Sequence, residues 1–236
     1  MPPSIIAIDG PVASGKSSIG KRLADDLGYL FFDTGVMYRA VTFLALRELG
    51  TVTDEAAVAA LARSAHIDVL APTVPDGRDC TILAGFPAAG GAEIVTEDIT
   101  WAARTKEVEN HVSLVAAMQG VRRILTAQMR RVGLRGRVVM TGRDVGTVIL
   151  PEADLKIFLT ASVETRARRR FEEVRGRGEV RAYADVLANL RERDRIDSSR
   201  ALAPLRVADD AIVLDTTDLS IEEVVERIEA LVRVRE

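Results

Sequence analysis

The feature that most constrains this chain is a glycine-rich segment near its start. Residues 10–17 read GPVASGKS and match the pattern G-x-x-x-x-G-K-[S/T] at each fixed position. An apolar, β-branched run at residues 4–9 precedes the segment, and helical periodicity from Lys16 to Leu27 follows it. The glycines let backbone N–H groups turn inward around anionic oxygens, and the helix N-terminus adds partial positive charge. The pattern predicts a strand–loop–helix unit that binds the phosphates of a nucleoside triphosphate.

Two side chains of this segment have expected roles of their own. In such loops the lysine reaches the β- and γ-phosphates and the following hydroxyl holds Mg²⁺, so we assign these roles to Lys16 and Ser17, with a magnesium-bound nucleoside triphosphate as the ligand. Asp9 and Asp33 are both candidates for an acidic residue that assists the metal. The predicted phosphate-binding segment is Gly10, Pro11, Val12, Ala13, Ser14, Gly15, Lys16, Ser17 and Ser18.

Apolar runs alternate with helical patterns along most of the remaining chain. Four further strands are predicted at residues 29–33, 137–144, 155–161 and 210–216, and helices include residues 35–49 and 220–235. Apolar strands separated by helices are typical of a parallel sheet covered on both faces. We therefore predict an α/β fold: a P-loop NTPase core with a parallel five-stranded sheet flanked by helices. Ser220 and Glu223 form a predicted capping box at the start of the last helix.

Two segments depart from this alternation. Residues 66–100 are rich in Pro and Gly and contain two short predicted strands about a PDGRD turn, which indicates a small β-rich insertion. Residues 164–200 are helical in pattern and crowded with arginine and acidic residues. We expect one domain over residues 1–236, with a core at 1–65, 104–163 and 201–236, the insertion at about 66–103, and a helical lid at about 164–200.

Composition excludes several classes of function. The net charge of −3 gives no general affinity for nucleic acid or for an acidic membrane. Cys80 is the only cysteine, so no internal disulfide or thiolate metal cluster is possible. The apolar run before Asp9 is too short for a signal-peptide core. We expect a cytoplasmic monomer that binds neither nucleic acid nor membrane.

Other nucleotide-binding classes fit the motifs less well. A switch GTPase usually reads guanine with Asn-Lys-x-Asp, but the two asparagines, Asn110 and Asn189, are followed by His and Leu. A motor or transport ATPase normally has an acidic residue directly at the end of an apolar strand, whereas residues 138–144 read VVMTGRD. An RNA-binding basic helix at residues 164–200 is disfavoured because acidic residues are interspersed among the arginines.

Arginines recur at the carboxyl ends of the predicted strands, where ligands bind in such sheets. Arg39 follows the second strand, and Arg143 with Asp144 ends the third. Arg193, Asp197 and Arg200 share one face of a predicted helix. Each group alone is compatible with a solvated surface, where an ion pair contributes little stability. Their recurrence indicates a pocket for a second phosphorylated ligand.

Several segments together resemble bacterial cytidylate kinase, of the nucleoside monophosphate kinase group. They read IDGPVASGKSS, FDTGVMYRA, TKEVENHVSLVAAMQGVR, TGRDVGTVILPEADLKIFL and ERDRIDSSRALAPL, and they run nearly from end to end of the chain. A P-loop alone is unspecific, whereas GRDVGTV combined with RDRIDSSRALAPL is highly specific. The segment between Gly85 and Arg104 is longer than is usual in this family, and Trp101 within it has no expected role.

The resemblance implies a site for CMP as the phosphoryl acceptor. Arg39 and Arg143 then bind the CMP phosphate, and Ser113, Arg193 and Asp197 bind the ribose. The cytosine is contacted by Thr34, Arg122 and Asp144, with Arg200 nearby. The implied CMP-binding set is Thr34, Arg39, Ser113, Arg122, Arg143, Asp144, Arg193, Asp197 and Arg200, and the β-rich insertion is the family's extra CMP-binding subdomain.

The resemblance also implies a lid and a reaction. Arg166, Arg169 and Arg170 would belong to a lid over ATP and bind ATP together with residues 10–18, and the residues closest to the chemistry would be Lys16, Arg143, Asp144 and Arg193. The implied reaction is reversible, Mg²⁺-dependent conversion of ATP and CMP or dCMP to ADP and CDP or dCDP, within pyrimidine nucleotide metabolism. His66 and His111 are expected to be structural. A kinase of UMP or shikimate, or a binding module without turnover, remains an alternative.

Overall fold

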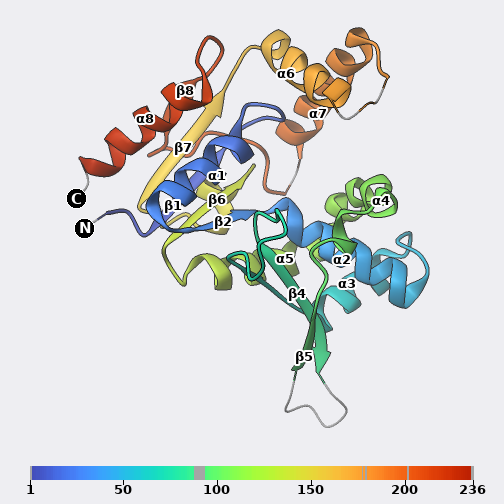
Figure 1. Cartoon of the computed structure of the whole chain (residues 1–236). Coiled ribbons are helices and arrows are strands. Elements are labelled where there is room, and N and C mark those ends of the chain that lie inside the picture. Colours follow the sequence, from blue (N-terminus) through green and yellow to red (C-terminus); the bar gives the residue numbers. More distant parts are fainter. Residues whose placement is uncertain (1, 88–93, 177, 179, 201, 235–236) are drawn as a thin grey trace. The chain divides into compact units, whose positions relative to one another are not determined.

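A computed structural model describes residues 2–87, 94–176, 178, 180–200 and 202–234. A five-stranded sheet confirms the expected α/β class (Figure 1). Its strand order is β2 (Leu30–Asp33), β6 (Val138–Gly142), β1 (Ile5–Asp9), β7 (Leu155–Thr160) and β8 (Ile212–Asp215). The chain divides into two compact units, residues 1–29 with 137–236 and residues 30–136. Of the expected domain segments, residue 1, part of the insertion and lengthened turn (88–93), residues 177 and 179 of the lid, and residues 201 and 235–236 lie outside the described residues.

The first unit contains most of the sheet and the helices that follow its strands. Its elements are β1 (Ile5–Asp9), α1 (Lys16–Leu27), β6 (Val138–Gly142), a π-helical turn (Val145–Ile149), β7 (Leu155–Thr160), α6 (Val163–Gly176), α7 (Tyr183–Ser199), β8 (Ile212–Asp215) and α8 (Ile221–Arg233). The predicted bounds of α1 are confirmed, and so is the capping box of Ser220 and Glu223 at the start of α8.

The parallel pairing of β1 places the glycine-rich loop beside the turns that follow β6 and β7. β1 pairs with β6 from Ile5 opposite Val138 to Asp9 opposite Gly142, and on its other edge it pairs with β7. Ile6 and Ile8 of β1 are fully buried. Because all these strands are parallel, their carboxyl ends meet at one edge of the sheet, and the loops at that edge can contribute to one site.

The second unit begins with β2 and contains the β-rich insertion. Its elements are β2 (Leu30–Asp33), α2 (Gly35–Leu49), α3 (Glu55–Ser64), β3 (His66–Leu70), β4 (Thr81–Pro87), β5 (Ile94–Asp98), a 3₁₀ turn (Ala102–Arg104), α4 (Lys106–Ala117) and α5 (Gln119–Gly133). The predicted helix at residues 35–49 is confirmed as α2.

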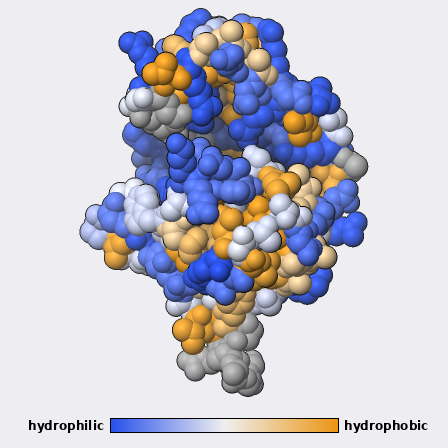
Figure 2. All heavy atoms as spheres, turned by 90° about the vertical axis from the view of Figure 1, so that its right-hand side faces the viewer, coloured by the Kyte–Doolittle hydropathy of each residue, from blue (hydrophilic) through white to orange (hydrophobic). Residues whose placement is uncertain are grey.

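The insertion forms a three-stranded antiparallel sheet rather than the expected two strands. β3 and β4 pair about the predicted turn, and β5 adds a third strand from Leu83 opposite Asp98 to Pro87 opposite Ile94. Every residue of β5 is exposed, so its sequence does not show the alternation of apolar and polar residues that marks a half-buried strand. The strand is recognised only by its pairing with β4. Figure 2 shows hydrophobic side chains on this hairpin, in agreement with the exposure of Ile94 and Val95.

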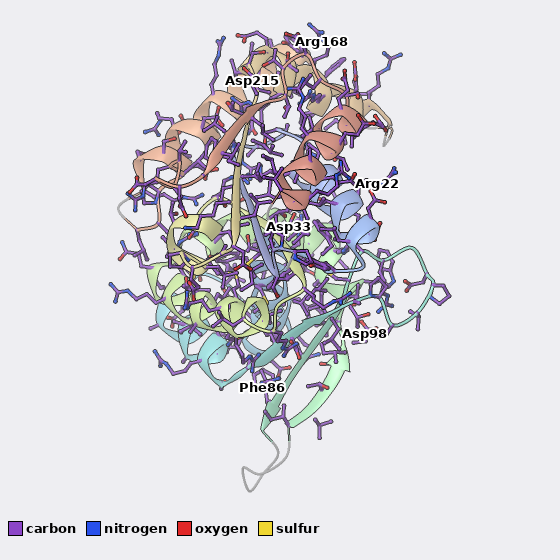
Figure 3. The ribbon with its side chains drawn as sticks, turned by 90° about the vertical axis from the view of Figure 1, so that its left-hand side faces the viewer. Arg22, Asp33, Phe86, Asp98, Arg168 and Asp215 are labelled. Carbon is purple, nitrogen blue, oxygen red and sulfur yellow. The ribbon has the colours of Figure 1, made fainter. Side chains whose placement is uncertain are left out.

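A buried arginine connects the turn of the insertion to its third strand. Arg78 forms a two-point contact with Asp76, 2.8 Å from Nε to Oδ1 and 2.6 Å from Nη2 to Oδ2, and it also pairs with Asp98. Asp98 of β5 lies opposite Leu83 of β4, and Figure 3 shows Asp98 and Phe86 at different positions along this small sheet. The indole Nε1 of Trp101 donates to Asp76 Oδ2 at 2.7 Å. Trp101, for which the sequence predicts no role, therefore helps to hold this turn in place.

None of the helices in the described part of the chain is both long and apolar enough to cross a membrane.

Candidate active site

The glycine-rich loop joins β1 to α1 as predicted. Gly10 passes so close to β7 that a Cβ atom there would lie 2.1 Å from the carbonyl oxygen of Leu159. Gly15 has φ +92°, a conformation that favours glycine, and Lys16, Ser17 and Ser18 form the first turn of α1. The Lys16 ammonium donates to Pro11 O at 2.6 Å and to Ser14 Oγ at 3.3 Å, so its charge lies against the loop itself. This geometry fits an anion bound by backbone N–H groups and one lysine.

Asp9 ties the end of β1 to the turn that follows β6. Its two carboxylate oxygens accept from the amides of Val145 at 2.9 Å and Gly146 at 2.7 Å, directly after Arg143 and Asp144. Burial raises the pKa of Asp9 to about 6; the Gly146 and Val145 amides oppose the shift, nearby Asp144 adds to it, and Lys16 opposes it. Asp9 therefore acts as a structural acceptor between the P-loop strand and the segment that carries Asp144.

The raised pKa of Asp9 predicts a pH-dependent stability. The folded value of about 6 exceeds the ordinary value of 3.8, so the folded chain binds more protons than the unfolded chain between these values. The contribution of Asp9 to stability is therefore lost as the pH rises from about 4 to about 6, by about 3 kcal/mol.

This expectation is checked by urea unfolding of the wild type and of Asp9→Asn between pH 4 and pH 7. Relative to the variant, the wild type should lose free energy of unfolding across that range. The subtraction is needed because the lowered pKa values of groups such as Asp98 act in the opposite direction in both proteins. If the free energy of unfolding changed with pH in the same way in the two proteins, the raised pKa of Asp9 would be contradicted.

Three arginines of the first unit, Arg143, Arg193 and Arg200, lie around the carboxylate of Asp197, and a fourth, Arg170, neighbours Arg193. Asp197 Oδ2 accepts from Arg143 Nε at 3.0 Å, and Oδ1 pairs with Arg200 just beyond the end of α7. Arg193 has no hydrogen bond or ion pair within the described residues, and its electrostatic neighbours are Arg143, Asp197, Arg170 and Arg200. Burial, followed by Arg143, lowers the pKa of the Arg193 guanidinium. Concentrated positive charge of this kind suits a phosphorylated ligand.

The three arginines implied for the lid all lie on α6, but their partners differ. Arg166 is buried and forms a two-point ion pair with Asp194 of α7. Arg169 binds Thr216, which follows β8. Arg170 pairs with Glu173 on its own helix. Neither Asp194 nor Thr216 was predicted from the sequence, although Asp194 lies inside the ERDRIDSSR segment.

Four of the implied CMP-binding residues lie in the second unit. Thr34 is the N-cap of α2 and is buried, and Arg39 lies one turn further along that helix. Arg122 of α5 is also buried, and its guanidinium lies 5.6 Å from the centre of the Tyr38 ring on α2. Ser113 is exposed on α4. This unit thus brings Arg122 to α2, which also carries Thr34 and Arg39.

The histidines and the cysteine have structural surroundings. His66 Nδ1 lies 3.0 Å from Arg131, and burial followed by Arg131 lowers its pKa. His111 Nδ1 lies 2.8 Å from the carbonyl oxygen of Glu107 within α4. Cys80 is buried, and burial raises the pKa of its thiol to about 11, so it is protonated at neutral pH. The surroundings of the two histidines agree with their expected structural role.

Comparison with known proteins identifies the family. A sequence model described as cytidylate kinase matches residues 6–234. The chain belongs to the cytidylate kinase family. A cytidylate kinase of Herpetosiphon aurantiacus is 48% identical over 232 residues, covering 98% of this chain and 95% of that protein. The cytidylate kinase of Chloroflexus aggregans is 49% identical over 212 residues, covering 90% and 86%. That of Bacillus licheniformis is 45% identical over 223 residues, covering 94% and 93%.

The family membership confirms the resemblance on which the sequence-based expectations rest. It makes the chain a nucleotide-dependent phosphotransferase with a P-loop. The competing interpretations as a GTPase, a motor ATPase or a module without turnover are thereby set aside.

Proposed function

We propose that this chain transfers the γ-phosphoryl group of ATP to CMP or dCMP, forming ADP and CDP or dCDP in a reversible reaction. The observation that most strongly carries the proposal is the arginine cluster around Asp197, in the unit that also contains the P-loop. Transfer between two nucleotides requires two polyanions to approach, and guanidinium groups compensate for their repulsion. A hydrolase transfers the phosphoryl group to water and would not require a second cluster of arginines to bind an anionic acceptor.

No general base is required for this reaction. A phosphate monoester has a second pKa near 6, so the attacking oxygen of the acceptor is already largely anionic at neutral pH. That oxygen bonds to the γ-phosphorus while the bond to the bridging oxygen of ADP breaks. Lys16 and the loop amides hold the donor phosphates, and Arg143 and Arg193 compensate for negative charge during transfer. The structural surroundings of His66 and His111 are consistent with this chemistry.

Mg²⁺ fits the donor set of the loop. Ser17 supplies a hydroxyl oxygen at an exposed position in the first turn of α1, and Mg²⁺ prefers oxygen ligands and usually keeps bound water together with substrate phosphates. We propose that Ser17 holds the metal of Mg-ATP, where it neutralises charge on the phosphates. Asp9 is less suited to assist, because both its oxygens accept backbone amides.

The acceptor-binding residues are proposed by position within the family motifs. In the first unit they are Arg143, Asp144, Arg193, Asp197 and Arg200, and in the second unit they are Thr34, Arg39, Ser113 and Arg122. Asp144 is buried, and its carboxylate suits the exocyclic amine of cytosine, which uracil lacks. We propose that the insertion at about 66–103 serves CMP binding and that about 164–200 forms the lid over ATP. We further propose a cytoplasmic monomer that binds neither nucleic acid nor membrane; the net charge of −3, which gives no general affinity for polyanions, supports the last part of this proposal.

The test is ADP release measured in a coupled assay with ATP and Mg²⁺ against CMP, dCMP, UMP and AMP. We expect saturable ADP production that depends on CMP or dCMP, with UMP and AMP much poorer. ADP production that is independent of any acceptor would indicate a hydrolase. Nucleotide binding without ADP production would contradict the proposal altogether.

A further inference from the structure

Nearly all N–H donors of the Arg166 guanidinium contact oxygen atoms of the protein. Its Nε lies 3.0 Å from Ala161 O, its Nη1 lies 3.1 Å from one oxygen of Asp194 and 3.2 Å from Val12 O, and its Nη2 lies 2.6 Å from the other Asp194 oxygen. The Arg166 side chain is only 6% exposed. A guanidinium carries five N–H donors in a fixed fork, and four contacts of this geometry fix its orientation.

The contact with Val12 acts on the phosphate-binding loop itself. A peptide group is planar and trans, so the Val12 carbonyl and the Ala13 N–H point in opposite directions. Holding the carbonyl on Arg166 therefore sets the direction of the Ala13 N–H. Ala13 has φ +59°, an unfavourable conformation for a residue with a side chain, which persists only when its surroundings hold it. Arg166 provides one such constraint.

Arg169, one turn along α6, acts on the same loop through Thr216. Its Nη1 donates to the Thr216 hydroxyl at 3.0 Å and its Nη2 to the Thr216 carbonyl at 2.5 Å. The Thr216 hydroxyl lies 3.1 Å from Thr160 O and 3.4 Å from Ser14 O, and the residue is almost fully buried. Thus two carbonyls of the loop have contacts that depend on α6: Val12 O contacts Arg166 itself, and Ser14 O contacts the Thr216 hydroxyl that Arg169 binds.

Two further arginines of α6, Arg168 and Arg170, have different surroundings. Arg170 is 31% exposed, pairs with Glu173, and is an electrostatic neighbour of Arg193 in the arginine cluster. Arg168 is exposed and lies at the outer edge of α6 (Figure 3). Figure 2 shows that the surface over α6 and α7 is mostly hydrophilic, as expected where outward arginines are solvated.

We propose that Arg166 and Arg169, together with Asp194 and Thr216, are positioning residues that hold the P-loop carbonyls outward, and that Arg170 alone of the three contacts ATP. This revises the direct ATP contact that the family resemblance implies for Arg166 and Arg169, and it rests on the proposed binding of ATP by the loop. Asp194 also neighbours Arg193 on α7, so one guanidinium connects the loop to the helix that carries part of the arginine cluster.

The deciding measurement is the affinity for Mg-ATP without CMP, by isothermal titration calorimetry. Asp194→Asn should weaken ATP binding about tenfold, because the Arg166 fork loses one carboxylate oxygen and the loop loses its fixed donor. If Arg166 contacts the phosphates itself, releasing it from Asp194 leaves the affinity unchanged or raises it. Either of those results overturns the proposal. The double variant Arg166→Lys/Asp194→Asn should bind Mg-ATP no more weakly than the single variant with the lower affinity, because both substitutions act through one contact.

Glu164→Gln is the matched control. It breaks a second ion pair between α6 and α7, with Arg191, which is 3.3 Å long and exposed at both ends. ATP affinity should be unchanged in this variant, and an equal loss would attribute the effect to helix packing and overturn the proposal. Thermal unfolding reports whether each variant is folded.

Thr216→Val provides an independent variant should Asp194→Asn fail to fold. It removes the hydroxyl near Ser14 O, and ATP binding should weaken about threefold, whereas unchanged affinity overturns the proposal. The binding measurement needs no turnover. A wild-type chain that binds ATP but forms no ADP with CMP would contradict the proposed function while these affinities still decide the role of Arg166 and Arg169.

Discussion

Replacing Lys16 with alanine should lower kcat for CMP phosphorylation by about 10²–10³-fold while the chain remains folded. Lys16 is buried at the start of α1, with its ammonium on the carbonyl of Pro11 and the hydroxyl of Ser14. A lysine in this position reaches the β- and γ-phosphates, where negative charge shifts during transfer. Losing it removes charge stabilisation that water cannot replace in a closed site.

The measurement is steady-state ADP release with saturating CMP, alongside thermal unfolding of the same preparation. Lys21→Ala is the matched control, because Lys21 lies further along α1 and pairs at the surface with Asp25. It removes the same charge from the same helix and should leave kcat within about twofold. Full activity of Lys16→Ala would remove the P-loop lysine from the mechanism.

Replacing Asp144 with alanine should lower kcat/KM for CMP by about 10³-fold and change ATP affinity little. Asp144 is 6% exposed and precedes the π-helical turn that Asp9 holds through its amides. Its carboxyl group is assigned to the exocyclic amine of cytosine, which it would bind as a buried hydrogen-bond acceptor. Without it the amine of bound CMP has no equivalent partner.

Two readouts separate this role from a general loss of structure. The Mg-ATP dissociation constant should stay within about threefold of wild type, because Asp144 is not assigned to the donor. The ratio of kcat/KM for CMP to that for UMP should fall, since the variant no longer distinguishes amine from carbonyl. CMP turnover near the wild-type rate would show that another group reads the base.

Local elements were predictable because their signals are local. The helix that starts at Lys16 is set by a strand, a glycine-rich turn and a periodic apolar face, and α1 begins and ends where the sequence predicts. The Ser220–Glu223 box likewise depends on residues three apart. β5 was not predicted, because an exposed edge strand has no hydrophobic pattern and exists through its pairing with β4.

The sequence predicted that arginines take part in the site, but not which partner each arginine contacts. Arg166, Arg169 and Arg170 look equivalent in sequence, since each is an arginine in one helical segment. The fold gives Arg166 the carboxylate of Asp194 and the carbonyl of Val12, which lie 28 and 154 positions away along the chain. No periodicity or spacing rule encodes contacts at such separations.

The same distinction holds for the whole protein. The residue order by itself determined the phosphate loop, the α/β class and the family, because these depend on neighbouring residues and on motifs that keep their spacing. Only the tertiary structure decided that Asp9 accepts the amides after Asp144, that Trp101 binds Asp76, and which arginines face protein oxygens. The physical reason is that hydrogen bonds and burial are properties of position in space, and distant segments acquire common positions only when the chain folds.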